Sequence, residues 1–124
     1  MTVAFWCILA ASLLPILCAG LAKGGSPDFD NAQPRVWLAA QTGWRRRANW
    51  AQQNSLEAIA PFAAAVIVAR LAGAPQSMAD AVAVAFVLIR LGYIAAYIFD
   101  RPRLRSALFN LGLGCVIALF AVAA

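Results

Sequence analysis

Four long apolar segments alternate with short polar stretches along the chain. They cover residues 2–22, 47–72, 77–99 and 104–123. A helix of about 20 apolar residues crosses the hydrocarbon core of a bilayer, so each segment is long enough to span it. We therefore predict an all-α fold, a transmembrane four-helix bundle. At this length the chain should form a single domain, residues 1–124.

A cleavable signal peptide is the alternative interpretation of residues 2–22. Such a peptide opens with a basic region, whereas the first basic residue of this chain is Lys23. The segment is also long enough to cross the membrane. We expect it to be a retained transmembrane helix.

The connection between the first two apolar segments, residues 23–46, is expected to be a loop. It opens with a cluster of Gly, Pro, Asp and Asn, which is typical of loops, and it closes on the basic run Arg45–Arg47. Trp37 and Trp44 suit the headgroup layer. We expect the basic run to anchor the protein at anionic headgroups, the alternative being contact with a ligand.

Composition supports a membrane protein. The 124 residues are 64% hydrophobic and 12% charged, against about 45–50% and about 25% in soluble domains. The net charge of +5 does not indicate nucleic-acid binding, because no binding motif or interleaving of aromatic and basic residues accompanies it. The chain has three cysteines without CxxC spacing and no histidine, so we expect no metal site.

The distribution of Lys and Arg predicts the orientation in the membrane. Five basic residues fall between Lys23 and Arg47 and three around the third connection, residues 100–105, whereas neither end of the chain carries one. Basic loops tend to stay on the cytoplasmic side. Both termini should therefore be non-cytoplasmic, and the compact form suggests a bacterial inner membrane.

Polar residues recur at helical spacing on two neighbouring segments. Positions three, four and seven apart share one face of a helix. The second segment carries Arg47, Trp50, Asn54, Glu57 and Pro61 at that spacing, and the third carries Arg90, Tyr93 and Tyr97. A short turn joins the two segments, so they are antiparallel neighbours. We expect Glu57 and Arg90 to meet as an ion pair.

This constellation has two interpretations. The ion pair could simply fix the helix packing, with Tyr93 and Tyr97 as aromatic residues of the interface belt. Alternatively, charges inside a membrane mark a functional site, and these donors and cations would suit a small, anionic, polar ligand.

At these residues the sequence resembles the MAPEG family, the membrane-associated proteins of eicosanoid and glutathione metabolism. The family pattern on the second helix is Arg-Ala, then Asn, then Glu three residues on, then Pro-Phe; here it reads Trp50-Ala51, Asn54, Glu57 and Pro61-Phe62. On the third helix Arg90, Tyr93 and Tyr97 match the family spacing, and Arg105-Ser106 match an Arg-Ser step after the basic loop.

The resemblance implies a left-handed four-helix bundle that assembles as a homotrimer, with a glutathione site between subunits near the cytoplasmic face. The residues implied to hold glutathione are Asn54, Glu57, Arg90, Tyr93 and Tyr97. Arg105 would stabilise the thiolate of this co-substrate, and Ser106 would donate a hydrogen bond nearby. The implied activity is that of a membrane glutathione transferase or peroxidase acting on lipophilic electrophiles that enter from the bilayer.

Two positions depart from the family pattern. Trp50 stands where catalytic members usually carry Arg, and Gln53 stands where Arg or His is common. Both family side chains would contact glutathione carboxylates. The family also includes a non-catalytic, lipid-presenting member, so a lipid-binding or scaffold protein of the same fold is the alternative. A small transporter subunit is the weakest hypothesis, because the chain shows no inverted repeat.

Overall fold

The computed structural model describes residues 1–124 and contains helices only. Its five helices are α1 (Val3–Lys23), α2 (Pro34–Ala39), α3 (Gly43–Leu71), α4 (Gln76–Ile98) and α5 (Pro102–Ala121). The four longer helices are long and apolar enough to cross a membrane. The all-α fold and the four predicted spans are therefore confirmed, with boundaries shifted by a few residues.

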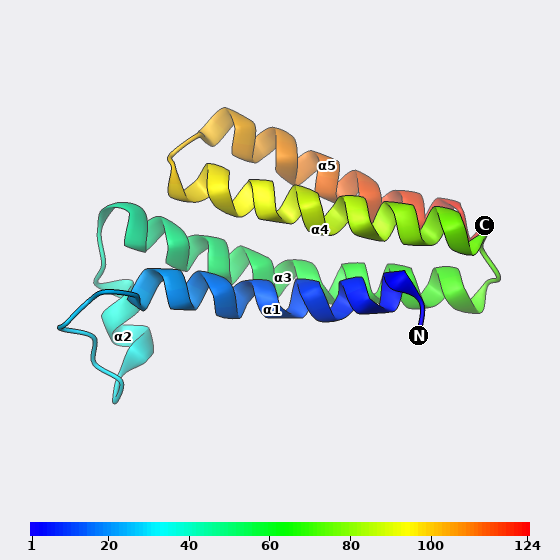
Figure 1. Ribbon diagram of the computed structural model, residues 1–124. Helices are drawn as coiled ribbons and strands as arrows, with labels where there is room; N and C mark the ends of the chain where they lie inside the picture. Colours follow the sequence, from blue (N-terminus) through cyan, green and yellow to red (C-terminus); the bar gives the residue numbers. More distant parts are fainter.

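The four long helices run antiparallel to their chain neighbours and form two layers (Figure 1). Helix α1 lies along α3 in one layer, and α4 lies along α5 in the other. Helix α4 contacts both helices of the first layer, and α5 contacts α3. Both termini lie at one end of the bundle, and α2 and the turn between α4 and α5 lie at the opposite end.

Small side chains let the helices approach closely in the centre of the bundle. The main core is rich in buried alanine from α1, α3 and α4, as expected where packing contacts hold membrane helices together. Its largest fully buried side chain is Phe62 of α3, which is 0% exposed. The Phe62 ring stacks on Phe86 of α4 with centroids 3.9 Å apart and planes 9° from parallel, and this pair joins the two layers.

The turn between α3 and α4 follows directly from its residues. Gly73 has a φ of +75°, in the left-handed region that glycine adopts without a steric penalty, and such a residue commonly ends a helix. Pro75 then occupies the N-cap of α4. The same fixed reversal makes α3 and α4 antiparallel neighbours, as the sequence predicts.

The expectation of a loop over residues 23–46 is wrong for its second half. Residues Pro34–Ala39 form α2, and α3 begins at Gly43, so the basic run lies on a helix. Trp37 and Leu38 of α2 are buried against Ala22 and the start of α3. A short apolar contact at the end of the bundle therefore holds this segment, which a Gly- and Pro-rich composition alone does not show.

Two arginines of this run cap the C-terminal ends of other helices. Arg45 Nη1 donates to the carbonyl oxygen of Ala22 at 2.7 Å, and Arg47 Nε donates to the carbonyl oxygen of Ile98 at 3.0 Å. The last carbonyls of α1 and α4 have no helical donor, and a cation there also opposes the helix dipole. Capping is thus a structural role for Arg45 and Arg47 that the sequence analysis did not foresee.

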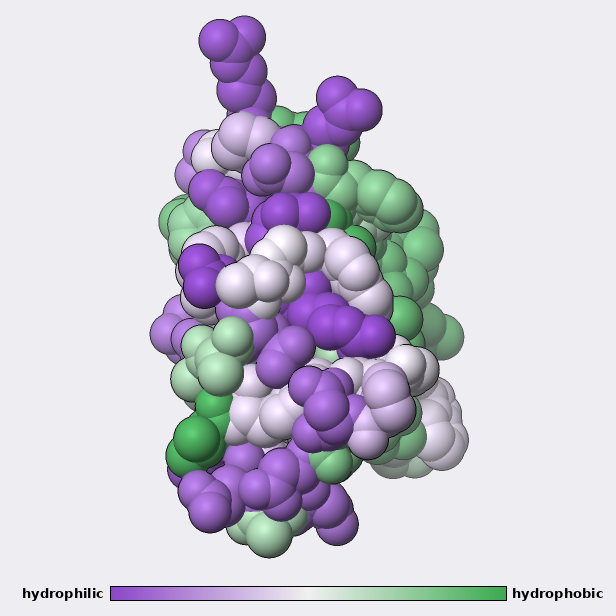
Figure 2. All heavy atoms as spheres, turned by 90° about the vertical axis from the view of Figure 1, so that its left-hand side faces the viewer, coloured by the Kyte–Doolittle hydropathy of each residue, from purple (hydrophilic) through white to green (hydrophobic).

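The surface separates by polarity along the bundle. Figure 2 looks onto the end that carries α2 and shows it largely covered by hydrophilic residues, with hydrophobic residues gathered along one flank. Many large apolar side chains are exposed on the sides, among them Trp6, Leu88 and Ile117. This arrangement fits a bundle whose sides contact lipid and whose α2 end contacts the headgroup layer.

Candidate functional site

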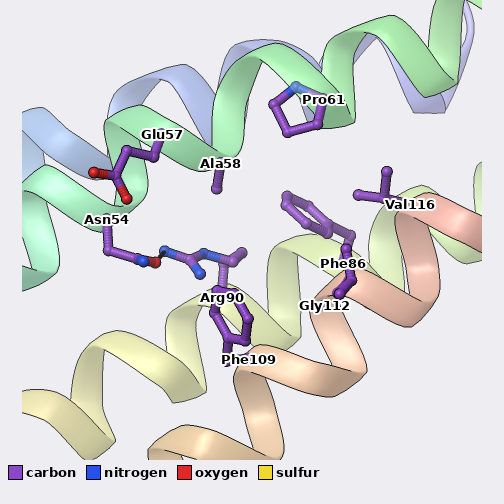
Figure 3. A pocket seen from close by; sticks show the side chains of 10 residues that line it. Asn54, Glu57, Ala58, Pro61, Phe86, Arg90, Phe109, Gly112 and Val116 are labelled. Carbon is purple, nitrogen blue, oxygen red and sulfur yellow. Dashed lines mark hydrogen bonds between the residues drawn. The ribbon is translucent and has the colours of Figure 1, made fainter.

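Two hollows adjoin the polar face of α3. The first, the α3–α5 cleft, has a volume of about 200 Å³ and lies between α3, α4 and α5 (Figure 3). It is lined by Asn54, Glu57, Ala58, Pro61, Phe86, Arg90, Phe109, Gly112, Leu113 and Val116. The second, the polar hollow, is a shallow surface depression lined by Trp50, Gln53, Asn54, Glu57 and Tyr97. Asn54 and Glu57 line both, so the two hollows are adjacent.

Arg90 is the most deeply buried charge of the site, with 3% of its surface exposed. Its Nη2 donates to Asn54 Oδ1 at 2.9 Å and to Ser55 Oγ at 3.2 Å. Its Nε is buried and has no hydrogen-bond partner. The guanidinium therefore rests on two neutral oxygens of α3 and, at 4.2 Å from the ring centroid, on the face of Tyr93.

The predicted Glu57–Arg90 ion pair does not form. Glu57 is exposed on the α3 surface, and Figure 3 shows Asn54, rather than Glu57, meeting the Arg90 side chain. The reason is the rotation of the helix. At about 100° per residue, Ser55 and Glu57 fall on opposite flanks of Asn54, and Arg90 approaches from the flank of Ser55. The carboxylate is thus left free at the mouth of the cleft.

Cations and aromatic rings alternate along one side of the polar hollow. The guanidinium of Arg46 lies 5.8 Å from the Trp50 ring, and the centroids of Trp50 and Tyr97 are 6.4 Å apart. The guanidinium of Arg105, on α5, lies 4.6 Å from the Tyr97 ring centroid. A cation–π contact is worth about 0.5–1 kcal/mol at an exposed site, so the contact with Tyr97 favours a position of Arg105 beside the hollow.

The structure brings most of the predicted site residues together. Asn54, Glu57 and Tyr97 line the polar hollow, with Arg105 directly above Tyr97. Tyr93 is buried beneath, its ring edge-to-face with Tyr97 at 5.6 Å. Ser106 differs from the others, because it is exposed and lines neither hollow.

A comparison with protein-family models matches nearly the whole chain, including every residue of the two hollows. Residues 3–124 match the MAPEG family. The chain belongs to the MAPEG family. Membership places this MAPEG protein among integral membrane proteins with glutathione-related transferase, peroxidase or eicosanoid-type functions. A comparison with curated proteins finds no match for the chain.

The sequence analysis did not predict several residues of this MAPEG protein's site. Ser55 lies one residue away from the predicted polar face of α3, and no spacing rule connects it to Arg90. Phe86 and Phe109 are apolar residues in apolar helices, so only their position at the cleft distinguishes them. Gly112 gave a weak signal as a small residue inside a spanning helix, which marks a place of close approach.

Proposed function

We propose that this protein is a membrane glutathione transferase or peroxidase. Glutathione would bind in the polar hollow, and its thiolate would attack a lipophilic electrophile that arrives from the bilayer. The observation that carries the proposal is the position of Arg105, an ordered guanidinium 4.6 Å above Tyr97 at the edge of a hollow with a free carboxylate. A cation beside a thiol lowers the thiol pKa and so raises the fraction of thiolate at neutral pH.

The remaining polar groups of the hollow fit the other parts of the tripeptide. Glu57 has no ion-pair partner in the chain and would bind the ammonium group of glutathione. The Asn54 side-chain oxygen is already engaged by Arg90, which leaves its amide nitrogen free to donate to a carboxylate. Arg90 and Tyr93 would support this wall from beneath, and the Tyr97 hydroxyl would donate to a carboxylate of the peptide.

The reaction would need no group beyond glutathione and the electrophile. The thiolate sulfur forms a bond to the electrophilic carbon, and the leaving group departs with the electron pair of the broken bond. With a hydroperoxide, the thiolate attacks the terminal oxygen and yields an alcohol and a sulfenic acid, which a second glutathione converts to the disulfide and water. Arg105 would stabilise the anionic sulfur before attack, and Ser106 would serve as a nearby hydrogen-bond donor.

The proposal includes the assembly and the orientation. A homotrimer would place the polar hollow of each subunit against its neighbour, and basic side chains of that neighbour would then bind the glutathione carboxylates that Trp50 and Gln53 cannot pair with. The α2 end would face the cytoplasm and both termini would face the other side, in a bacterial inner membrane. Cross-linking followed by native mass spectrometry would test the trimer.

A glutathione titration of the purified protein in nanodiscs tests the proposal. Saturable binding is expected, and Glu57→Gln should weaken it. Arg105→Ala should leave binding within about threefold, raise the pKa of the bound thiol toward the free value of about 8.5, and lower turnover with a chromogenic halonitrobenzene. Arg103→Ala is the matched control, since Arg103 is an exposed arginine in the first turn of α5. Full turnover in Arg105→Ala would refute the thiolate role.

A non-catalytic lipid-binding or scaffold function is the second candidate, and Trp50 is the observation that favours it. Its ring fills the side of the hollow between Arg46 and Tyr97, where catalytic members carry a charge for glutathione. One charge-assisted hydrogen bond is worth about 1.5–3 kcal/mol, so its loss would weaken binding more than tenfold. No binding at millimolar glutathione, together with restored binding in Trp50→Arg, would support this candidate.

A further inference from the structure

A third hollow, the α4–α5 groove, lies apart from the two hollows already described. It has a volume of about 430 Å³ and is lined by Gly92, Ala95, Ala96, Phe99, Arg101, Leu104 and Leu108. It shares no lining residue with the α3–α5 cleft or the polar hollow. Apart from Arg101 its lining is apolar, so the groove suits a hydrocarbon chain rather than a polar ligand.

Small side chains of α4 create the groove and leave it open to the side of the bundle. Gly92 lies so close to α5 that a Cβ there would be 3.4 Å from Leu108 Cδ1. Ala95 is exposed, and Phe99 and Leu104 are 74% and 52% exposed. From Gly92 to Phe99 the groove follows α4 for about 10 Å, given the helical rise per residue. It therefore faces the bilayer along one end of the α4–α5 pair.

A patch of charge adjoins that end of the groove. A further depression, the basic hollow, is lined by Asp100, Arg101, Pro102, Arg103 and Leu104. It shares Arg101 and Leu104 with the groove. The turn between α4 and α5 lies at the same end of the bundle as α2 (Figure 1), where the headgroup layer is expected. An apolar groove thus ends in a basic hollow at the depth of lipid phosphates.

The two arginines of the basic hollow are available to a ligand, whereas the other clustered arginines are engaged. Residues 45–47 each donate a hydrogen bond to a backbone carbonyl oxygen, and Arg105 lies over the Tyr97 ring. Arg101 and Arg103 are exposed, and their side chains make no hydrogen bond to the chain and no ion pair with Asp100. Headgroup contact, which the sequence analysis assigned to the basic run, is therefore more accessible at the α4–α5 turn.

We propose that the α4–α5 groove and the basic hollow together bind one phospholipid that carries a single net negative charge. Its phosphate pairs with Arg101 and Arg103, and the upper part of one acyl chain lies in the groove over Ala95. Two arginines and one aspartate, Asp100, give the basic hollow a net charge of +1, which complements one negative charge. The inference is independent of the proposed function, because it uses no residue of the glutathione site.

The continuity of charge and apolar surface favours a lipid over a free phosphate. A free phosphate would use the arginines and leave the groove empty, whereas a phospholipid occupies both at once and reaches them from the bilayer. One basic residue near an anionic membrane surface corresponds to roughly a fivefold preference for the anionic lipid. Asp100 opposes that preference, so the site should discriminate by about the amount of one net charge.

Lipid titration followed by native mass spectrometry of the full chain, released from a mild detergent, tests the proposal. Palmitoyl-oleoyl phosphatidylglycerol and the phosphatidylcholine with the same acyl chains differ in net charge but not in hydrocarbon. Phosphatidylglycerol should bind roughly fivefold more tightly. Arg101→Gln should remove this preference. Arg35→Gln is the matched control and should retain it, since Arg35 is an exposed arginine on α2 at the same end of the bundle.

Two further variants keep the test decisive if Arg101→Gln does not fold. Asp100→Asn removes the opposing charge and should tighten phosphatidylglycerol severalfold. Asp100 has a φ of +56°, a conformation that Asn also tolerates. Ala95→Trp fills the groove and should weaken both lipids severalfold. Ala81→Trp should not, because Ala81 is an exposed alanine in the first half of α4, away from the groove.

Three results would overturn the inference. The first is equal affinity of the wild-type protein for the two lipids. The second is a preference for phosphatidylglycerol that survives both Arg101→Gln and Ala95→Trp, which would place the lipid elsewhere. The third is a change in subunit number in Ala95→Trp, which would assign the groove to a second copy of the chain. The titration contains no glutathione, so its outcome is read separately from that of the glutathione titration.

Discussion

The support of Arg90 by neutral oxygens makes Asn54 the most informative residue to change. Asn54→Leu preserves the approximate volume of the side chain and removes the oxygen that accepts from Arg90 Nη2 at 2.9 Å. Arg90 then retains one hydrogen bond, the longer one to Ser55 at 3.2 Å. The variant therefore leaves a buried guanidinium, 3% exposed, with most of its support removed.

The expected cost follows from the charge on the donor. A hydrogen bond to a charged group contributes about 1.5–3 kcal/mol, against about 0.5–1.5 kcal/mol for a neutral one. Hydrogen bonds between membrane helices average only about 0.6 kcal/mol, because the separated helices find other partners. Arg90 is charged and 3% exposed, so we expect the free energy of unfolding to fall by about 2 kcal/mol.

A double-mutant cycle isolates this interaction. Arg90→Met alone removes the charge and leaves Asn54 without its donor, and Asn54→Leu/Arg90→Met replaces both partners by apolar groups. Because an apolar replacement of both members of a buried polar pair is often close to neutral, the double variant should be more stable than Asn54→Leu alone. The coupling energy should be about 1–2 kcal/mol.

Reversible unfolding in mixed micelles of dodecyl sulfate and a mild detergent, followed by circular dichroism, gives the four free energies. Gln53→Leu is the matched control, since Gln53 is a neighbour of Asn54 on α3 and makes no hydrogen bond to Arg90; its change should stay within about 0.5 kcal/mol. Additive effects of the two substitutions, with no coupling energy, would show that Asn54 does not stabilise Arg90 and would refute the reasoning.

Three further predictions concern the scaffold. Phe62→Ala should lower the free energy of unfolding by about 3–5 kcal/mol, because it opens a cavity at a fully buried ring; thermal unfolding measures this, and a loss below about 1 kcal/mol would contradict the packing. Asp80→Ala should cost about 1 kcal/mol and expose the first turn of α1 to hydrogen exchange, because Asp80 Oδ1 accepts from the Ala4 N–H at 2.8 Å, as a helix cap does; unchanged exchange would argue against the cap. A hydrogen bond from the Ser26 hydroxyl holds the pKa of the exposed Asp28 carboxyl below its ordinary value of 3.8. Ser26→Ala should raise that pKa in an NMR titration. The small stabilisation should be present above the ordinary pKa and disappear as the pH falls through the lowered one, whereas an unchanged titration would show that Ser26 is not the cause.

The cleft between α3 and α5 shows what the sequence did not predict. Its lining residues Phe109, Gly112 and Val116 follow the ordinary pattern of an apolar spanning helix, so periodicity gave no reason to separate them from residues that face lipid. They form a cleft because α5 packs less extensively against α3 than against α4. Helix-to-helix distances of this kind depend on which side chains interlock, and packing of that type is not encoded in hydropathy.

The sequence by itself determined the four spanning helices, their antiparallel order and the grouping of Asn54, Glu57, Arg90 and Tyr97 toward one end. These features depend on segment length, turn residues and charge, which act locally along the chain. Only the tertiary structure decided that Arg90 bonds Asn54 and Ser55 and leaves Glu57 free. Spacing fixes how residues are arranged around one helix, but the rotation of two helices against each other comes from packing, which selects the partner of a buried charge.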